Sequence, residues 1–278
     1  MSDNERELLQ DEALVLHVKN YQTADKYVIC FTKEHGKLRF IAYGARYVKN
    51  VQGRLLQPFA CLAISVQQGQ KVDKLRGCEL VRLPQNLDMQ QMAYGAVVAE
   101  LTAVLTEDRE SAPELYELLQ ATFAALTQRN PRLVALSFAI KLLQLTGFAP
   151  QMEHCVSCGA PIATECGAKA SPADCELSTP IEAKAAAEAS ARAWFSPLQG
   201  GLVCESCHGN YAGQGLEPCA PETRALWRWL AALDYAAPAP FRVRGGTLME
   251  LERLLYKFIF FQTDKPLNSL NFLSQMGL

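Results

Sequence analysis

The chain has 278 residues, 49% of them hydrophobic and 20% charged, and this composition excludes a disordered protein and predicts a globular one with one large or several smaller domains. No run of about 18 uncharged apolar residues occurs, which argues against a transmembrane helix. Residues 1–12 are acidic and polar, unlike a signal peptide. We therefore expect a cytoplasmic protein with no membrane association.

Charge is distributed unevenly along the chain. Residues 13–82 carry twelve Lys or Arg against four acids, whereas the whole chain has a formal net charge of -2. A basic module joined to a more acidic remainder suggests that the first module meets a polyanion. A solvated charged face is the alternative interpretation.

Residues 13–82 are expected to form five short strands, because apolar, β-branched and aromatic residues gather in short runs there. In the third run Leu38, Phe40 and Ala42 fall on one face and Lys37, Arg39, Ile41 and Tyr43 on the other, and residues 34–36 before it fit a hairpin turn. Five strands in about 70 residues indicate a small barrel, of either the OB or the SH3-like type. The runs are residues 13–18, 27–32, 37–43, 59–66 and 74–81.

The hydrophobic period changes to that of helices after residue 83. We predict helices over 89–105 and 113–126, and a third that Asn130 caps, that begins at Pro131 and that ends before Gly147. Further helices are expected over 222–233 and 247–261, followed by a short turn or helix within 267–276. The linker 236–240 separates the first two of these. The domains predicted are a nucleic-acid-binding barrel (1–82), a helical domain in two parts (83–150 and 221–278) and a cysteine-rich module (151–220).

The basic module contains a candidate nucleic-acid interface, in which cations that follow phosphates are interleaved with aromatic rings that stack on bases. The alternative interpretation of Tyr43 and Tyr47 is that they are half-buried packing residues and do not contact bases. The candidates are Lys37, Arg39, Tyr43, Arg46, Tyr47, Lys49 and Arg54, with Lys71, Lys74 and Arg76 as a second basic group.

Two CxxC pairs, Cys155/Cys158 and Cys204/Cys207, predict one structural zinc site with four thiolate ligands. The pairs lie 45 residues apart, against roughly 15–20 in a compact ribbon, and an insert over 164–192 accounts for the excess. Its Ala-rich part is either a surface helix or a flexible segment. A redox CxxC is the competing interpretation, but it requires a thioredoxin-like context that is missing. Other residues near the pairs that could act as ligands are Cys166, Cys175, His154 and His208.

Sequence motifs of common catalytic sites are absent: the chain has no GxxxxGK[ST], no GxSxG and no HExxH. The acidic residues Glu107, Asp108 and Glu110 are better explained by a solvated loop than by a two-metal site. The charge, barrel and cysteine patterns favour a non-enzymatic nucleic-acid-binding protein. The alternatives are a zinc-containing RNA-binding module, a metal-dependent nuclease with an unrecognised acidic site, and a protein-binding scaffold.

Several short motifs follow one another along nearly the full length of the chain. They are Ala13-Leu14-Val15-Leu16, Tyr21, Asp25, Val28, Phe31 to Lys37, Gly44-Ala45-Arg46, Leu56 to Phe59, Cys155/Cys158-Gly159, Phe195, Gly200-Gly201, Cys204/Cys207, Leu251-Glu252, Leu254-Leu255 and Ser269 to Leu273. Their order and spacing resemble those of the RecO recombination mediators. The Ala-rich stretch between the CxxC pairs looks longer than usual for that family.

The resemblance implies an α+β multidomain protein: an N-terminal five-stranded OB barrel, then a helical bundle that carries an inserted zinc module with four cysteine ligands. It implies binding to single- and double-stranded DNA, annealing of complementary strands, and loading of RecA onto strands coated by single-strand-binding protein (SSB). The implied partners are RecR and the C-terminal tail of SSB, in a nucleoid-associated repair protein.

Overall fold

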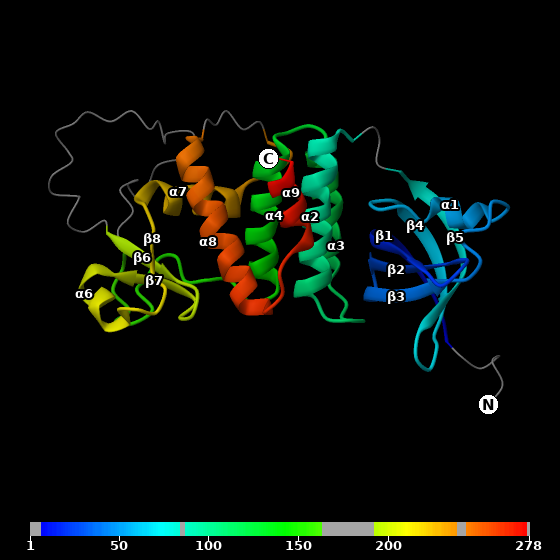
Figure 1. Cartoon of the computed structure of the whole chain (residues 1–278), viewed down its shortest axis with the longest axis horizontal. Helices are drawn as coiled ribbons and strands as arrows, with labels where there is room; N and C mark the ends of the chain where they lie inside the picture. Colours follow the sequence, from blue (N-terminus) through cyan, green and yellow to red (C-terminus); the bar gives the residue numbers. More distant parts are fainter. Residues whose placement is uncertain (1–6, 84–86, 163–191, 238–242, 277–278) are drawn as a thin grey trace. The chain divides into compact units, whose positions relative to one another are not determined.

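The computed structural model describes residues 7–83, 87–162, 192–237 and 243–276 (Figure 1). Most of the Ala-rich insert, with Cys166 and Cys175, and residues 238–240 of the expected linker lie outside these ranges. The chain forms two compact units. Unit 1 comprises Met1–Leu142 and Leu267–Leu278, and unit 2 comprises Leu143–Pro266.

Unit 1 begins with a closed five-stranded barrel, as expected. Its strands are β1 (Leu8–Tyr21), β2 (Asp25–Thr32), β3 (Gly36–Ala42), β4 (Cys61–Gln67) and β5 (Asp73–Arg82). They follow the order β1-β2-β3-β5-β4 and close through a β1–β4 pair, with all pairs antiparallel except β3–β5. This Greek-key order decides for the OB rather than the SH3-like arrangement.

The alternation of side chains in β2 and β3 separates the barrel interior from its outer face. Val28 and Cys30 of β2 and Leu38, Phe40 and Ala42 of β3 belong to the buried core. Because successive side chains of a strand point to opposite sides, the intervening residues face outward. The outer row therefore pairs Tyr27 with Ile41, Ile29 with Arg39, and Phe31 with Lys37.

The segment that joins β3 to β4 contains a short helix, α1 (Val51–Leu55), which the hydrophobic pattern did not predict. Asn50 caps this helix: its side-chain oxygen accepts a hydrogen bond from the backbone N–H of Gly53, at 2.9 Å. At Gly53 a Cβ atom would come within 1.9 Å of the backbone oxygen of Ala45, so only glycine allows this close approach. A five-residue helix is too short for a periodic signal, and the Asn50 cap defines where it begins.

Helices complete unit 1 next to the barrel. α2 (Met89–Leu105) and α3 (Pro113–Leu126) have the predicted bounds, and α4 (Pro131–Leu145) contains the boundary between the units. The last helix, α9 (Asn268–Gln275), packs on α2. The Glu100 carboxylate of α2 accepts hydrogen bonds from the backbone N–H groups of Asn268 and Ser269, at 2.9 and 2.8 Å, and so satisfies two donors at the start of α9.

Polar contacts connect α3 to β1. The Tyr116 hydroxyl and the Gln120 side-chain amide donate to the Glu12 carboxylate at 2.9 and 3.1 Å. Burial by itself raises the pKa of Glu12, but hydrogen bonds from Cys61, Tyr116 and Gln120 and the charge of Arg82 outweigh it, and the pKa falls below its usual value.

Unit 2 combines a small sheet with two longer helices and a short one. β6 (Ala193–Ser196) lies between β7 (Gly201–Cys204) and β8 (Glu217–Pro218), followed by α7 (Pro221–Ala232) and α8 (Gly245–Thr263). The rings of Phe195 and Phe258 meet edge to face at 5.8 Å and join the sheet to α8. A short helix, α6 (Glu205–His208), follows β7 directly. None of the helices within the described residues is long and apolar enough to cross a membrane.

Candidate nucleic-acid interface and metal centre

The outer side of β3 and β5 brings together the two basic groups that the sequence separates. Arg39 lies on β3, and Lys74 on β5 pairs in register with Ile41 of β3. The Lys74 ammonium lies 6.0 Å from the centre of the exposed Tyr43 ring, at the outer limit of a cation–π contact. We call Arg39, Tyr43, Lys71 and Lys74 the basic face.

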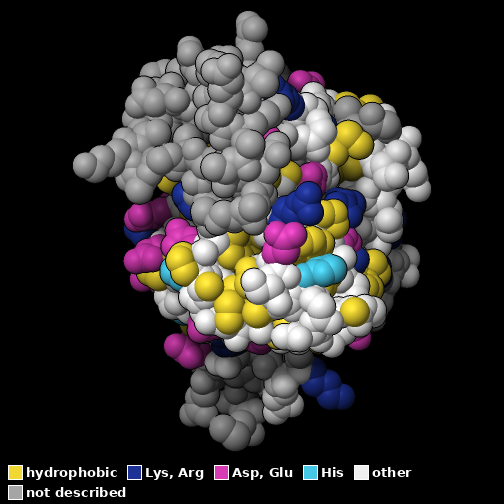
Figure 2. Space-filling model, turned by 90° about the vertical axis from the view of Figure 1, so that its left-hand side faces the viewer, with side chains coloured by type: hydrophobic (Ala, Val, Ile, Leu, Met, Phe, Trp, Pro, Cys, Tyr) yellow, Lys and Arg dark blue, Asp and Glu magenta, His cyan; other side chains and the backbone are white. Residues whose placement is uncertain are grey.

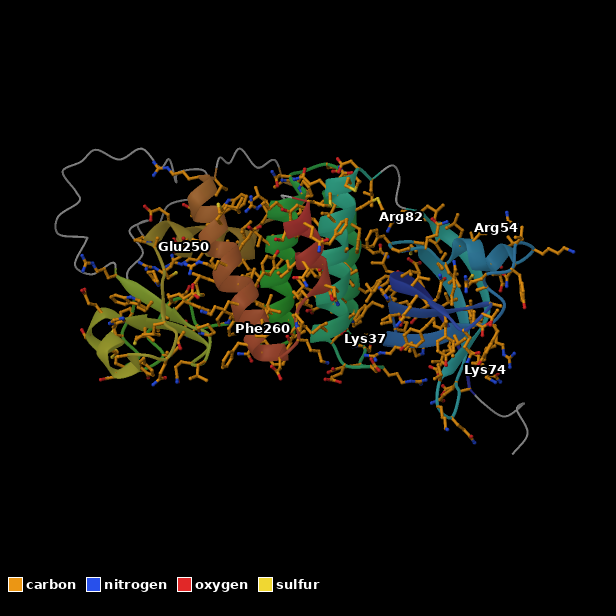
Figure 3. The ribbon with its side chains drawn as sticks, viewed as in Figure 1. Lys37, Arg54, Lys74, Arg82, Glu250 and Phe260 are labelled. Atoms are coloured by element: carbon orange, nitrogen blue, oxygen red, sulfur yellow. The ribbon has the colours of Figure 1, made fainter. Side chains whose placement is uncertain are left out.

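The segment between β3 and α1 carries the next group of candidates. Arg46, Tyr47 and Lys49 are exposed there, Tyr47 by 66%, and Arg54 follows within α1. The Arg46 guanidinium donates to the backbone oxygen of Thr23 at 2.9 Å, which ties this segment to the β1–β2 turn. Figure 3 marks the positions of Arg54 and Lys74 on the barrel. Tyr43 and Tyr47 are both exposed, so they are not the half-buried packing residues of the alternative interpretation.

Arg76, the last member of the second basic group, is exposed on β5. Its Nε donates to the Gln67 side-chain oxygen of β4 at 2.8 Å, within the antiparallel β4–β5 pair. This contact leaves part of the guanidinium open to solvent.

Lys37 differs from the other candidates because its side chain is buried, with only 3% exposed. Its ammonium donates to the backbone oxygens of Ala103, at 2.7 Å, and Thr106, and lies 3.3 Å from the Asp108 carboxylate. Burial lowers the pKa of Lys37, and the nearby Asp108 only partly offsets this effect. Lys37 therefore caps the C-terminal end of α2, and in this structure it lacks the exposure that a phosphate contact requires (Figure 3).

The acidic residues after α2 likewise have a specific place. Asp108 lies 3.1 Å from the Arg39 side chain as well as beside Lys37, and Arg109 pairs with Asp73 of β5 at 2.5 Å. The loop that follows α2 is thus fastened to β3 and β5, rather than being only a solvated loop. Two residues that were not among the predicted candidates, Tyr27 and Arg109, also lie beside the basic face. The strand alternation places Tyr27 on the outer side of β2, whereas no local sequence pattern indicates Arg109.

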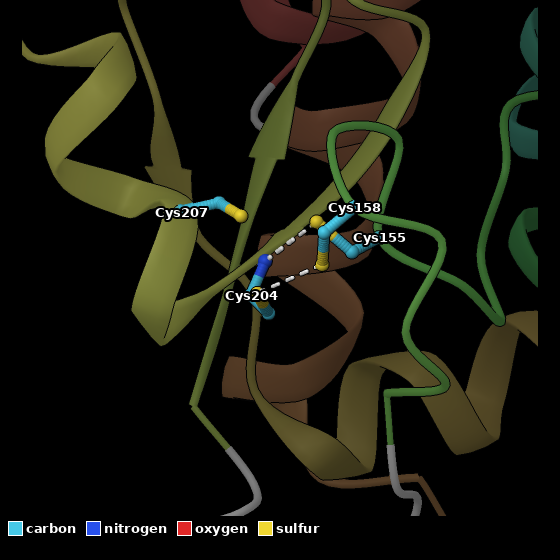
Figure 4. Close-up of side chains that lie close together, drawn as sticks. All are labelled: Cys155, Cys158, Cys204 and Cys207. Atoms are coloured by element: carbon cyan, nitrogen blue, oxygen red, sulfur yellow. Dashed lines mark hydrogen bonds between the residues drawn. The ribbon is translucent and has the colours of Figure 1, made fainter.

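The four cysteines of the CxxC pairs come together in unit 2 (Figure 4). Their sulfur atoms all lie within 4.8 Å of one another, and those of Cys158 and Cys204 are 3.7 Å apart. Four thiolates around Zn²⁺ at about 2.3 Å would place their sulfurs about 3.8 Å apart. The cluster therefore has the dimensions of a tetrahedral metal site.

Backbone geometry positions the sulfurs. Gly159 adopts a left-handed conformation with φ of 72°, and its N–H donates to the Cys155 carbonyl at 2.9 Å, which closes the first knuckle. The backbone N–H of Cys204 points at the Cys155 sulfur, at 3.4 Å. The second knuckle forms where β7 ends and α6 begins.

The electrostatics of the cluster favour a bound cation. Burial disfavours the Cys155 thiolate, but N–H groups of Cys204, Cys158 and Ser157 outweigh it and lower the pKa of Cys155 to about 6. At Cys204, burial and the neighbouring sulfurs raise the pKa to about 12. The Cys155 thiolate is thus stabilised while Cys204 resists ionisation, and a divalent cation at the centre would remove that resistance.

Neither neighbouring histidine belongs to the group of side chains that the structure brings together. The His208 ring lies against Trp194, with ring centres 4.1 Å apart, and His154 is exposed. Cys219 is a separate buried thiol, and burial raises its pKa to about 12. On the face that Figure 2 presents, hydrophobic side chains lie among both acidic and basic ones.

Comparisons with known proteins place the chain in a family. Residues 6–84 match the model of the Recombination protein O N-terminal region, and residues 86–271 match the C-terminal one. The chain is 27% identical to the DNA repair protein RecO of Symbiobacterium thermophilum, with 95% of this chain and 96% of the relative covered. It is 29% identical to the RecO protein of Myxococcus xanthus, with 98% and 99% covered. The two models together span both units, and the chain belongs to the RecO family of DNA repair proteins.

Proposed function

We propose that this protein is a non-catalytic DNA-repair mediator that binds single- and double-stranded DNA through its barrel and anneals complementary strands. One observation carries the proposal: an OB barrel presents exposed cations next to exposed tyrosines along β3, β5 and the β3–α1 segment. OB barrels bind oligonucleotides on the β2–β3 face and on the β1–β2 and β4–β5 loops. Arg39 lies on that face, Lys71 lies in the β4–β5 loop, and Arg46 is hydrogen-bonded to the β1–β2 turn. Family membership supports a role in repair.

The chemistry of the basic face explains how annealing would proceed. Lys and Arg side chains neutralise phosphates and lower the repulsion between two strands, and they leave the base edges free to pair. Tyr43 and Tyr47 offer flat surfaces on which bases of any sequence stack. Binding is therefore expected to weaken steeply with salt and to depend little on sequence.

The proposed partners follow from the family. We propose that the protein acts with RecR, contacts the C-terminal tail of SSB and helps to load RecA onto SSB-coated strands. Cys155, Cys158, Cys204 and Cys207 would hold one Zn²⁺. With four protein ligands the ion has no open position, so its role would be to stabilise the fold of unit 2.

The first test compares two double variants in binding to a labelled oligo-dT. Lys71→Gln/Lys74→Gln removes two cations from the basic face, and Lys33→Gln/Lys265→Gln removes two exposed cations elsewhere. We expect the first variant to bind roughly tenfold more weakly at about 0.1 M salt, with a salt slope shallower by about 1.4, and the second to bind like the parent protein. Equal losses in both variants would show that the basic face is not the interface.

A second measurement tests the mediator role. Two complementary oligonucleotides, one coated with SSB, are mixed with and without the protein in the absence of ATP. Faster, salt-sensitive annealing is expected. Intact strand binding without faster annealing would contradict the mediator role, and a strong preference for RNA of the same sequence would favour an RNA-binding module.

A further inference from the structure

A pocket of about 430 Å³ lies beside the basic face, where the outer side of β3, the turn between β4 and β5 and the loop after α2 meet. Four cationic side chains line it against two acids, so the pocket as a whole favours an anion. Tyr27 forms part of the same wall. The cations are Lys37, Arg39, Lys71 and Arg109, and the acids are Asp73 and Asp108.

The loop after α2 occupies a defined position at the pocket rim. The backbone N–H of Arg109 donates to the Lys37 carbonyl at 2.9 Å, and Arg109 has a left-handed conformation with φ of 64°. At Gly36 a Cβ atom would come within 1.8 Å of the Glu110 carbonyl oxygen, so the loop approaches β3 as closely as only glycine allows. Asp108 is thereby held against β3.

The cations of the pocket differ in how fully they are neutralised. Lys37 is already satisfied by two carbonyls of α2, and Arg109 is paired with Asp73. Arg39 is 44% exposed, and among the described residues Asp108 is its only polar partner. Within the same described ranges, Lys71 has no ion pair or hydrogen bond through its side chain.

A guanidinium donates hydrogen bonds to two oxygens of a phosphate with the same fork of N–H groups that binds a carboxylate. The Asp108 carboxylate is itself 47% exposed, so it can turn toward solvent while Lys37 keeps its carbonyl partners. The same Asp108 oxygen lies 3.3 Å from the buried Lys37 ammonium, so a phosphate that displaces Asp108 from Arg39 must also supply the negative charge beside Lys37.

We propose that this pocket is a subsite for one phosphate of the bound strand. Asp108 forms an ion pair with Arg39 until that phosphate displaces the Asp108 carboxylate. The inference rests on the proposed function, because the anion is taken to be a phosphodiester of DNA. By competing for Arg39, Asp108 lowers the affinity of the protein for the strand at this one phosphate. The lower affinity favours release of the strand after annealing. Lys71, which faces no such competitor, makes the initial contact.

The test is a double-mutant cycle on oligo-dT binding, measured by fluorescence anisotropy at about 0.1 M salt. Asp108→Asn keeps the size of the side chain and an acceptor for Lys37, and is expected to tighten binding roughly threefold to tenfold. In an Arg39→Gln background the same change is expected to have no effect. The matched control is Glu110→Gln, which removes an exposed charge from the same loop without contact to Arg39 and is expected to change affinity less than twofold.

A gain from Asp108→Asn that persists in the Arg39→Gln background, or that Glu110→Gln reproduces, would assign the effect to general charge and overturn the proposal. The single variants provide a second measurement that does not need the Asp108 variant to fold. Arg39→Gln is expected to weaken binding less than Lys71→Gln, because Arg39 starts from a neutralised state. A larger loss at Arg39 would contradict the competition.

Inorganic phosphate separates the strand from the free ion. When phosphate replaces chloride at equal ionic strength, oligo-dT affinity is expected to stay the same within twofold, since a single ion makes one of the contacts that a strand makes. Competition at millimolar phosphate would assign the pocket to a free anion instead. Failure of the cycle while Lys71→Gln/Lys74→Gln still weakens binding would remove this subsite and leave the proposed function standing.

Discussion

The cysteine cluster of unit 2 and the basic face of the barrel differ in how strongly the surrounding residues determine whether each side chain can perform its proposed role. The four thiols are chemically alike and lie within 4.8 Å of one another, and their proposed role requires only that closeness. In the basic face Lys71 is exposed, whereas Arg39 forms an ion pair with Asp108. Lys37, which lies on β3 together with Arg39, is buried. A metal site depends on ligand type and spacing, whereas an electrostatic surface depends on which charges remain uncompensated.

The largest expected effect is at the cysteine cluster. Cys207→Ala should lose the metal and the folded state of unit 2, because binding of a structural Zn²⁺ contributes about 10–16 kcal/mol in small zinc domains. The barrel should stay folded, because its core is separate. Metal content per chain and hydrogen exchange of both units measure these outcomes.

The matched control for that variant is Cys219→Ala, which removes a buried thiol of unit 2 outside the cluster. It should keep one zinc per chain. Purified protein without zinc, or a Cys207→Ala variant with unchanged hydrogen exchange in unit 2, would contradict a structural metal site.

The next effect separates two neighbours on β3. Lys37→Met should lower the free energy of unfolding by about 2–3 kcal/mol, because the carbonyls of Ala103 and Thr106 lose their charged donor. Arg39→Met should change stability by less than about 0.5 kcal/mol, because the side chain is exposed and its ion pair is weak.

DNA affinity should change in the opposite way to stability: Arg39→Met should weaken DNA binding, and folded Lys37→Met should not. Urea unfolding measures the stability of the two variants, and fluorescence anisotropy measures their DNA affinity. If Lys37→Met weakens DNA binding as strongly as Lys71→Gln does, then Lys37 contacts DNA in the complex and leaves its position at α2.

The smallest expected effect concerns the turn that precedes β3. The Asp11 carboxylate accepts from the backbone N–H of Glu34 at 2.8 Å and contacts His35 Nδ1 at 2.8 Å. Burial by itself raises the pKa of Asp11, but the hydrogen bonds from His35, Glu34, Thr32 and Glu12 outweigh it and lower the pKa below its usual value. The folded state thus favours the ionised carboxylate.

Because this pKa is depressed on folding, the stabilisation is complete above the unfolded pKa of about 3.9 and is lost as the pH falls through the lower folded value. Asp11→Asn should therefore cost about 1 kcal/mol at pH 7 and less at pH 3. Urea unfolding of both proteins at pH 7, 5 and 3 measures the difference. A pH-independent difference would show that the charge of Asp11 does not contribute.

Local sequence determined most of the elements of this protein and the membership of the cysteine cluster. The helices at Met89–Leu105 and Pro113–Leu126 follow from an apolar period of 3.6 and Pro at a helix start, and the strands from alternation, all of which act over a few residues. The four-cysteine cluster could be predicted from the two CxxC pairs alone, since any fold that brings the two knuckles together assembles the same four sulfurs.

Only the tertiary structure decided the strand order of the barrel and which of the charges on β3 are buried. Lys37 and Arg39 share one face of one strand, and nothing in their local sequence distinguishes them. The loop after α2, more than 60 residues later, covers Lys37 and leaves Arg39 at the rim. A charge is buried or free according to what packs against it, and long-range packing is the one property that a local pattern does not contain.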